Sequence, residues 1–224
     1  MNKFKYSKRK FKSTFKTILE YDDSYEIGEA ALPAYSHQNP IIDWLFWKRI
    51  KIALKFAKVK KTQQRILDFG CGSGVLSYML ALDEHLITSC DIEFGPFNKV
   101  RQIIDFPDNI NFIQGDILNM NFKEASFDII YALDVLEHID DLEPYVTLFS
   151  ELLVPGGTVI ISGPTENIFY KIGRKIAGKR FSGDYHVTNI SFIKNVFSLQ
   201  MNVKTIKKIQ FPVFLFEIFG AQNK

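Results

Sequence analysis

Short apolar runs alternate with amphipathic segments along most of the chain, and this alternation predicts its secondary structure. Apolar runs bounded by glycine or polar residues are typical of strands in a parallel sheet, because both faces of such strands are buried. The predicted strands span residues 66–69, 86–91, 110–114, 127–131, 158–162, 203–209 and 213–219. Segments with a helical apolar spacing predict helices over residues 41–59, 75–82, 96–104, 142–153 and 190–199. The alternation indicates an α/β sheet with right-handed crossovers, closed by an antiparallel hairpin.

A glycine-rich turn separates the first predicted strand from the helix that follows it. Gly70, Gly72 and Gly74 stand at alternate positions, so the backbone can turn sharply and no side chain blocks a ligand from the peptide units. The turn leads into a helix N-terminus, where unpaired N–H groups and the positive end of the dipole attract an anion such as a carboxylate. Strand, turn and helix together predict half of a nucleotide-type site at the carboxyl ends of a parallel sheet.

Acidic residues accompany the first three predicted strands. Asp91 ends the second strand, 17 residues beyond Gly74, where a carboxylate would accept hydrogen bonds from ribose hydroxyls. Asp116 follows the third strand, where it could read an exocyclic amine, and Asp68 lies two residues before the turn. Each acid alone could be a helix cap or a turn residue. Their joint register with three strands favours a nucleoside-binding edge.

The glycine run departs from the fingerprint of nicotinamide dinucleotide sites. That fingerprint has glycine or alanine three residues after its second glycine, which allows close packing of helix on strand. Counted from Gly70 and Gly72, this position is occupied by Val75. The departure disfavours a nicotinamide oxidoreductase.

The successive motifs resemble those of the class I S-adenosylmethionine-dependent methyltransferases, and most closely the small-molecule group that includes quinone-biosynthesis methyltransferases. The resemblance covers about residues 40–220 and is carried by Ile66–Gly74, Asp91, Gly115–Ile117, Phe127–His138 and Leu152–Gly157. It implies a Rossmann-like, mostly parallel sheet of seven strands in the order 3-2-1-4-5-7-6, with strand 7 antiparallel and helices on both faces. We expect residues 1–40 to be a basic N-terminal arm with an irregular lead-in or lid, and residues 41–224 to be the methyltransferase domain.

The resemblance also implies S-adenosyl-L-methionine as the cofactor and a set of residues that bind it. These residues are Asp68, Gly70, Cys71, Gly72, Gly74, Asp91, Ile92, Asp116, Ile117, Ala132 and Leu133. The glycine turn would lie beneath the methionine portion, with Asp68 positioning its ammonium group. Asp91 would hold the ribose beside Ile92, and Asp116 would accept from the adenine amino group. The end of the fourth strand would lie near the sulfonium.

Two histidines are candidates to remove the proton of the methyl acceptor, because imidazole titrates near neutral pH. His186 lies in the loop before the late helix, and His138 follows Glu137 at a predicted helix start. Each could instead be a packing or helix-start residue. Asp134, Glu137 and His138 also resemble a spacing that binds a divalent ion in some quinone methyltransferases. The same groups can serve as caps, so no metal ligand is assigned.

The positive charge is concentrated near the N-terminus. Seven basic residues precede the first acid, and the remainder of the chain has 21 basic and 25 acidic residues. The basic arm could contact anionic lipid or phosphate, or it could be a solvated and partly disordered terminus. A basic and aromatic segment over residues 169–181 could likewise face a membrane or an anionic acceptor.

Several function classes are disfavoured by what the sequence lacks. The acidic body and the missing signature of base amino-methylation after the fourth strand argue against a nucleic-acid acceptor. Two cysteines, apolar runs too short to span a bilayer and the lack of a secretory apolar region favour a cytoplasmic protein. No feature indicates an oligomeric state.

The sequence therefore predicts an enzyme that transfers a methyl group from S-adenosylmethionine to a small-molecule or lipid-linked acceptor. Oxygen is the expected acceptor atom, with carbon and nitrogen as alternatives. A non-catalytic partner or regulatory subunit that binds the cofactor would carry the same binding residues, and this alternative stays open.

Overall fold

The structure, a computed structural model, describes residues 2–22, 32–57, 62–165, 187–210 and 214–224. The chain divides into two compact units, each built from two stretches of sequence. Unit 1 contains Met1–Gln64 and Cys71–Asp116, and unit 2 contains Arg65–Gly70 and Ile117–Lys224. The two units are described separately below.

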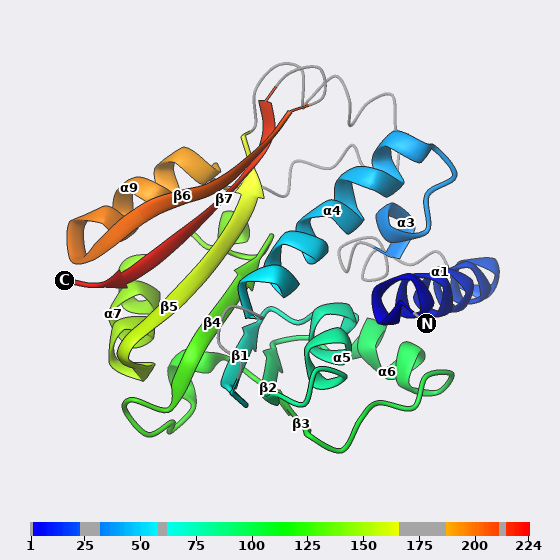
Figure 1. Cartoon of the computed structure of the whole chain (residues 1–224), viewed down its shortest axis with the longest axis horizontal. Helices are drawn as coiled ribbons and strands as arrows, with labels where there is room; N and C mark the ends of the chain where they lie inside the picture. Colours follow the sequence, from blue (N-terminus) through cyan, green and yellow to red (C-terminus); the bar gives the residue numbers. More distant parts are fainter. Residues whose placement is uncertain (1, 23–31, 58–61, 166–186, 211–213) are drawn as a thin grey trace. The chain divides into compact units, whose positions relative to one another are not determined.

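The described strands form a seven-stranded sheet in the order β3-β2-β1-β4-β5-β7-β6 (Figure 1). The strands are β1 (Arg65–Phe69), β2 (Leu86–Asp91), β3 (Ile110–Gln114), β4 (Phe127–Leu133), β5 (Leu153–Pro164), β6 (Met201–Gln210) and β7 (Phe214–Asn223). The pairs β1–β4, β2–β3 and β4–β5 are parallel, whereas β7 runs antiparallel to both β5 and β6. The predicted strand order and the antiparallel seventh strand are confirmed.

Five of the helices listed next, those that begin at Pro40, Val75, Gly95, Glu143 and Ile190, agree with the predicted ones to within a few residues at each end, whereas the others were not predicted. They are α1 (Lys3–Tyr21), α3 (Leu32–Tyr35), α4 (Pro40–Ala57), α5 (Val75–Ala81), α6 (Gly95–Arg101), η1 (Ile117–Asn119), η2 (Leu136–His138), α7 (Glu143–Leu152) and α9 (Ile190–Gln200). Asn189 caps α9, because its side chain accepts hydrogen bonds from the first N–H groups of that helix.

In unit 1, helix α1 occupies most of the basic N-terminal segment, which the sequence left open as a lipid- or phosphate-binding arm or a solvated, partly disordered terminus. Phe11, Phe15 and Ile18 recur at a spacing of four and three residues, and all three side chains are buried. The Phe11 ring centroid lies 5.2 Å from that of Tyr78 on α5. The sequence analysis did not predict this helix, because the lysines between the buried positions conceal its apolar face. The division between an arm and a methyltransferase domain at residue 40 stays a prediction.

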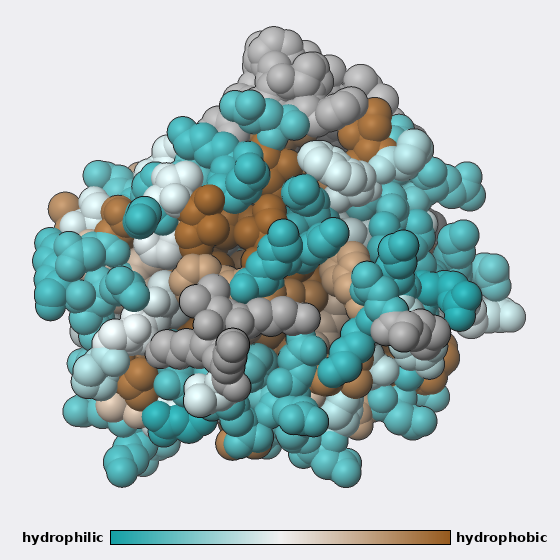
Figure 2. Space-filling view, in the orientation of Figure 1, coloured by the Kyte–Doolittle hydropathy of each residue, from teal (hydrophilic) through white to brown (hydrophobic). Residues whose placement is uncertain are grey.

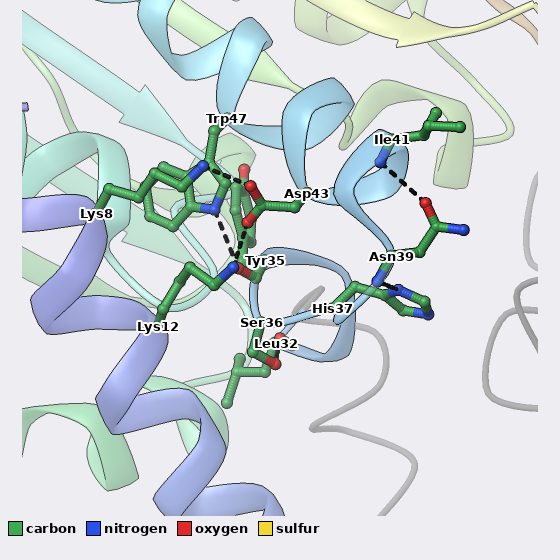
Figure 3. Close-up of polar contacts among 10 residues, drawn as sticks. All are labelled: Lys8, Lys12, Leu32, Tyr35, Ser36, His37, Asn39, Ile41, Asp43 and Trp47. Atoms are coloured by element: carbon green, nitrogen blue, oxygen red, sulfur yellow. Dashed lines mark hydrogen bonds and ion pairs between the residues drawn. The ribbon is translucent and has the colours of Figure 1, made fainter. Parts of the chain in front are cut away.

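An ion-pair cluster joins α1 to α4 (Figure 3). The Asp43 carboxylate accepts hydrogen bonds from Lys8 Nζ at 2.6 Å and from Lys12 Nζ at 2.5 Å. Burial alone would raise the pKa of Asp43, but the hydrogen bonds and charges of the two lysines outweigh it and lower the pKa. Nearby, Trp47 Nε1 donates to the Tyr35 carbonyl at 3.0 Å, which ties α4 to the short helix α3.

The core of unit 2 is formed by strands whose side chains are buried on both faces. The central residues of β4 and β5 are fully buried, as expected for inner strands of a parallel sheet. Beside β6 and β7, Lys194 Nζ of α9 donates to Glu217 at 2.7 Å, and Thr205 Oγ1 donates to the same carboxylate at 2.6 Å. Burial alone would raise the pKa of Glu217, but these hydrogen bonds and the positive charge of Lys194 lower it.

Candidate functional site

The glycine-rich turn adopts a left-handed backbone at each of its three glycines, with φ of 69° at Gly70, 52° at Gly72 and 75° at Gly74. An L-residue is strained in this region, so glycine is favoured there. A Cβ at Gly70 would overlap the Val135 side chain, whereas no described atom lies within 4 Å of the place that a Cβ at Gly72 would occupy. The open space beside Gly72 is the place where a ligand could lie against the backbone.

In unit 1, the turn is bonded directly to the end of β2. The Gly72 N–H donates to Asp91 Oδ2 at 2.8 Å, and the Cys71 N–H donates to the Cys90 carbonyl at 3.2 Å. The Glu93 N–H donates to the other carboxylate oxygen, Asp91 Oδ1, at 3.2 Å. Two residues that the sequence predicts to share a site, Gly72 and Asp91, are thus brought together.

Burial and hydrogen bonding shift the pKa of Asp91 in opposite directions. Burial raises the pKa of this carboxyl group, and the hydrogen bonds from the Gly72, Glu93 and Ile92 backbone N–H groups offset only part of that effect. Each carboxylate oxygen that accepts one N–H keeps lone-pair capacity for a further donor. Hydroxyl groups of a ligand could supply those donors.

The other residues of unit 1 that are predicted to bind the nucleoside, Ile92 and Asp116, lie just after the ends of β2 and β3. The Gly115 N–H donates to the Asp91 carbonyl at 2.8 Å, so the backbone before Asp116 is bonded to the end of β2. Ile92 is 72% exposed, which is unusual for an aliphatic side chain at a strand end. Asp116 is half-buried, and its neighbour Ile117, the first residue of unit 2, is buried at the start of η1. An exposed aliphatic surface next to carboxylates suits the face and edge of a purine.

In unit 2, Asp68 and the end of β4 lie in neighbouring strands. Asp68 is buried and stands opposite Tyr131 in the β1–β4 register, and Phe69 stands opposite Ala132. Ala132 is fully buried and Leu133 is half-buried. The predicted residues of these two strands therefore share the carboxyl end of one strand pair.

A polar clamp fixes the chain where β4 ends. Asp134 has a φ of 56°, a left-handed conformation that is uncommon for a residue with a side chain. The Ser162 Oγ donates to Asp134 Oδ1 at 3.0 Å, and the Asp134 N–H donates to the Ser162 carbonyl at 3.0 Å. Sequence reasoning missed this clamp, because nothing in the local pattern pairs two residues that lie 28 positions apart.

The two candidate bases fall in different parts of the chain. His138 is the last residue of the short helix η2, not the start of a helix, and its side chain is exposed. His186 lies outside the described residues. Its neighbour Val187 is described, and the Val187 N–H donates to the carbonyl of the buried Glu137 at 2.8 Å.

Two findings concern only the residues that the structure describes. Among them, no group of three or more His, Cys, Asp and Glu side chains is arranged to hold a metal ion. No helix in the described ranges has the length and apolar character needed to cross a bilayer. The basic segment over residues 169–181 lies outside the described residues.

Comparisons with known proteins agree with the fold. A family model described as a methyltransferase domain matches residues 67–161. The ubiquinone biosynthesis O-methyltransferase of Escherichia fergusonii is 27% identical over 106 residues, which make up 46% of this chain and 44% of that protein. The chain therefore spans less than half the length of the curated relatives that it matches.

Solved structures extend the likeness over most of the chain. The PH0226 protein from Pyrococcus horikoshii OT3 aligns with a TM-score of 0.64 at 18% identity, covering 86% of this chain and 96% of that one. The N-methyltransferase NodS from Bradyrhizobium japonicum WM9, solved with S-adenosyl-L-homocysteine, aligns with a TM-score of 0.62 at 17% identity, covering 96% and 98%. At these identities the likeness establishes a shared fold.

Proposed function

We propose that this chain is a class I S-adenosylmethionine-dependent methyltransferase, which transfers a methyl group from S-adenosyl-L-methionine to a small-molecule acceptor. The observation that supports this most directly is the hydrogen bond from the Gly72 N–H to the Asp91 carboxylate. A bare backbone turn and a carboxylate at the end of the next strand are the two groups that a nucleoside with a charged tail requires.

The proposed roles of the cofactor residues are those that the family resemblance implies. Asp91 accepts from the ribose hydroxyls with the lone pairs left over by its bonds to backbone N–H groups. The exposed Ile92 covers one face of the adenine, and Asp116 accepts from the exocyclic amino group. Asp68 positions the ammonium group of the methionine portion, and the end of β4 lies near the sulfonium.

The proposed reaction requires little covalent chemistry from the protein itself. S-adenosylmethionine supplies, when bound, a methyl group that its sulfonium charge already activates. The protein aligns the acceptor with the methyl group, excludes water and provides a group that takes up the acceptor's proton. We keep His138 and His186 as the candidates for that group. The exposed position of His138 suits contact with a bound acceptor, and His186 directly precedes a residue bonded to Glu137.

We infer that the acceptor atom is a hydroxyl oxygen of a small or lipid-linked molecule. The matched relatives carry the name of an O-methyltransferase of ubiquinone biosynthesis, which supports oxygen and a hydrophobic acceptor. Nitrogen is the alternative, since the structural neighbour NodS is an N-methyltransferase. A small acceptor also agrees with the sequence, because the acidic body of the chain argues against a nucleic-acid acceptor.

Two measurements test the proposal. Calorimetry should detect binding of S-adenosylhomocysteine and none of NAD. Turnover should be followed with radiolabelled S-adenosylmethionine and catechol-type acceptors, each with and without a prenyl chain, beside matching amines. Label in the phenols supports O-methylation, and label only in the amines overturns that choice of atom. Cofactor binding with no transfer to any acceptor of a whole metabolite extract favours the regulatory-subunit alternative.

A further inference from the structure

Charge is divided sharply between two helices and the remainder of the chain. Helices α1 and α4 together carry eleven Lys and Arg residues but only two acids, Glu20 and Asp43. The remainder of the chain has 17 basic and 23 acidic residues. A chain that is acidic elsewhere therefore has two strongly cationic helices within unit 1.

Internal ion pairs use only some of these positive charges. Lys8 and Lys12 are bonded to Asp43, and Lys3 Nζ lies 3.4 Å from Asp83 Oδ1. By contrast, Lys51 and Lys55 of α4 have exposed side chains, as does Lys5 in the first turn of α1. These cations face solvent and can attract an anionic partner.

One stripe of α4 combines exposed apolar side chains with Lys51, Lys55 and the half-buried Lys48. Its members recur at helical spacing and are Ile41, Trp44, Lys48, Lys51 and Lys55. Ile41 is 42% exposed and Trp44 is 41% exposed. We refer to these five residues as the α4 stripe. Figure 2 shows hydrophilic side chains gathered along the course of α4.

The cations of the α4 stripe lie close to aromatic rings. Lys48 Nζ is 5.6 Å from the centre of the Trp44 ring, and Lys51 Nζ is 6.0 Å from that of Phe4 on α1. An indole beside lysines is typical of side chains that sit where lipid headgroups meet acyl chains.

We propose that the α4 stripe docks the protein on an anionic lipid surface. Ile41 and Trp44 enter the headgroup layer, and the three lysines pair with lipid phosphates. The purpose of this contact, delivery of a lipid-linked acceptor, rests on the proposed function, but the contact itself does not. A nucleic-acid partner fits less well, because an exposed isoleucine has no role against a hydrated phosphate backbone.

Vesicle flotation tests the proposal with the full chain. Vesicles of phosphatidylglycerol and phosphatidylcholine should bind the protein, vesicles of phosphatidylcholine alone should not, and added salt should weaken the binding. Replacing Lys48, Lys51 and Lys55 by glutamine should lower the partition coefficient about 100-fold, since each lysine near the surface contributes about a fivefold factor. The matched control replaces Lys123, Lys204 and Lys207, three exposed lysines of unit 2, and should keep the parent's partitioning.

Tryptophan fluorescence provides a second, local readout. The chain has two tryptophans, and Trp47 is 2% exposed, so a shift to shorter wavelength on adding anionic vesicles should come from Trp44. Trp44→Phe should abolish this shift. Equal loss of partitioning in both lysine triplets, an unchanged emission spectrum, or tight binding of an RNA oligonucleotide without vesicle binding would overturn the proposal. Binding of S-adenosylhomocysteine should be unchanged in every variant, which separates this proposal from the cofactor site.

Discussion

The Gly72 N–H and the Asp91 Oδ2 atom lie 2.8 Å apart, so the turn before α5 and the end of β2 hold one another in place. This bond explains how a half-buried carboxylate is retained at a strand end although burial raises its pKa. It also places open backbone beside two carboxylate oxygens that can take further donors. Both residues can therefore be tested separately for binding and for stability.

Asp91→Asn should show how much this carboxylate contributes to cofactor binding, separately from its effect on the free energy of unfolding. Loss of the charge and of one acceptor should weaken S-adenosylhomocysteine binding about 10- to 100-fold, because a charged hydrogen bond contributes about 1.5–3 kcal/mol. Calorimetry measures this, with Asp105→Asn, an exposed aspartate, as the control.

The same variant should alter how stability depends on pH. Since the folded state raises the pKa of Asp91 above 3.8, the folded chain holds this proton more tightly than the unfolded chain. Its contribution to the free energy of unfolding therefore falls as pH rises from the unfolded pKa through the folded one. In urea titrations between pH 3 and pH 7, the Asn variant should lack this fall. A ligand-free variant that is much less stable than the parent at pH 7 would contradict this account.

Gly72→Ala should reduce cofactor binding with only a modest loss of stability. The backbone strain costs about 1–2 kcal/mol, and no described atom obstructs the new methyl group. Gly156→Ala is a matched control, because Gly156 has a φ of 76° and equally open surroundings but lies in β5. Both variants should unfold at lower urea concentration, and only Gly72→Ala should bind S-adenosylhomocysteine more weakly. Equal affinity in the two variants would remove the turn from the site.

Much of this site can be anticipated from the sequence because its residues stand at strand ends. The predicted bounds of β2 and β3 coincide with the observed ones, and Asp91 lies where the second strand was expected to end. Strand order cannot be derived from these local patterns, and it came from the resemblance to a family. The confirmed order therefore supports that resemblance more than it supports the periodicity argument.

Features that depend on distant partners could not be anticipated. The left-handed Asp134 requires its partner Ser162, which only the folded β4–β5 pair brings near. Helix α1 was missed for a different reason. Its buried Phe11 and Phe15 form a narrow apolar face. The many lysines around them favour a solvated segment when charge is considered before the helical spacing of the apolar residues.

Asp43→Asn should destabilise the protein near neutral pH and not in acid. Because Lys12 and Lys8 lower the pKa of Asp43 below 3.8, its carboxylate contributes stability that is present above the unfolded pKa. That contribution disappears as pH falls through the folded pKa. We expect a loss of about 1 kcal/mol at pH 7 in urea unfolding, and convergence with the parent near pH 2. Asp108→Asn, at an exposed position, should follow the parent at both pH values.

Lys194→Met should produce a pH dependence of the same sign at the ion pair between Lys194 and Glu217. In the parent, Lys194 holds the charge of Glu217, whose side chain has only 5% of its surface exposed. Without the lysine, burial raises the pKa of Glu217, so the folded state favours the protonated acid. The variant should lose about 3 kcal/mol at pH 7 and markedly less near pH 4, because the acid can then be neutral. Glu217→Gln combined with Lys194→Met should restore part of the loss at pH 7, and Lys204→Met should cause none. A pH-independent loss in Lys194→Met would show that the aliphatic stem of the lysine matters and its charge does not.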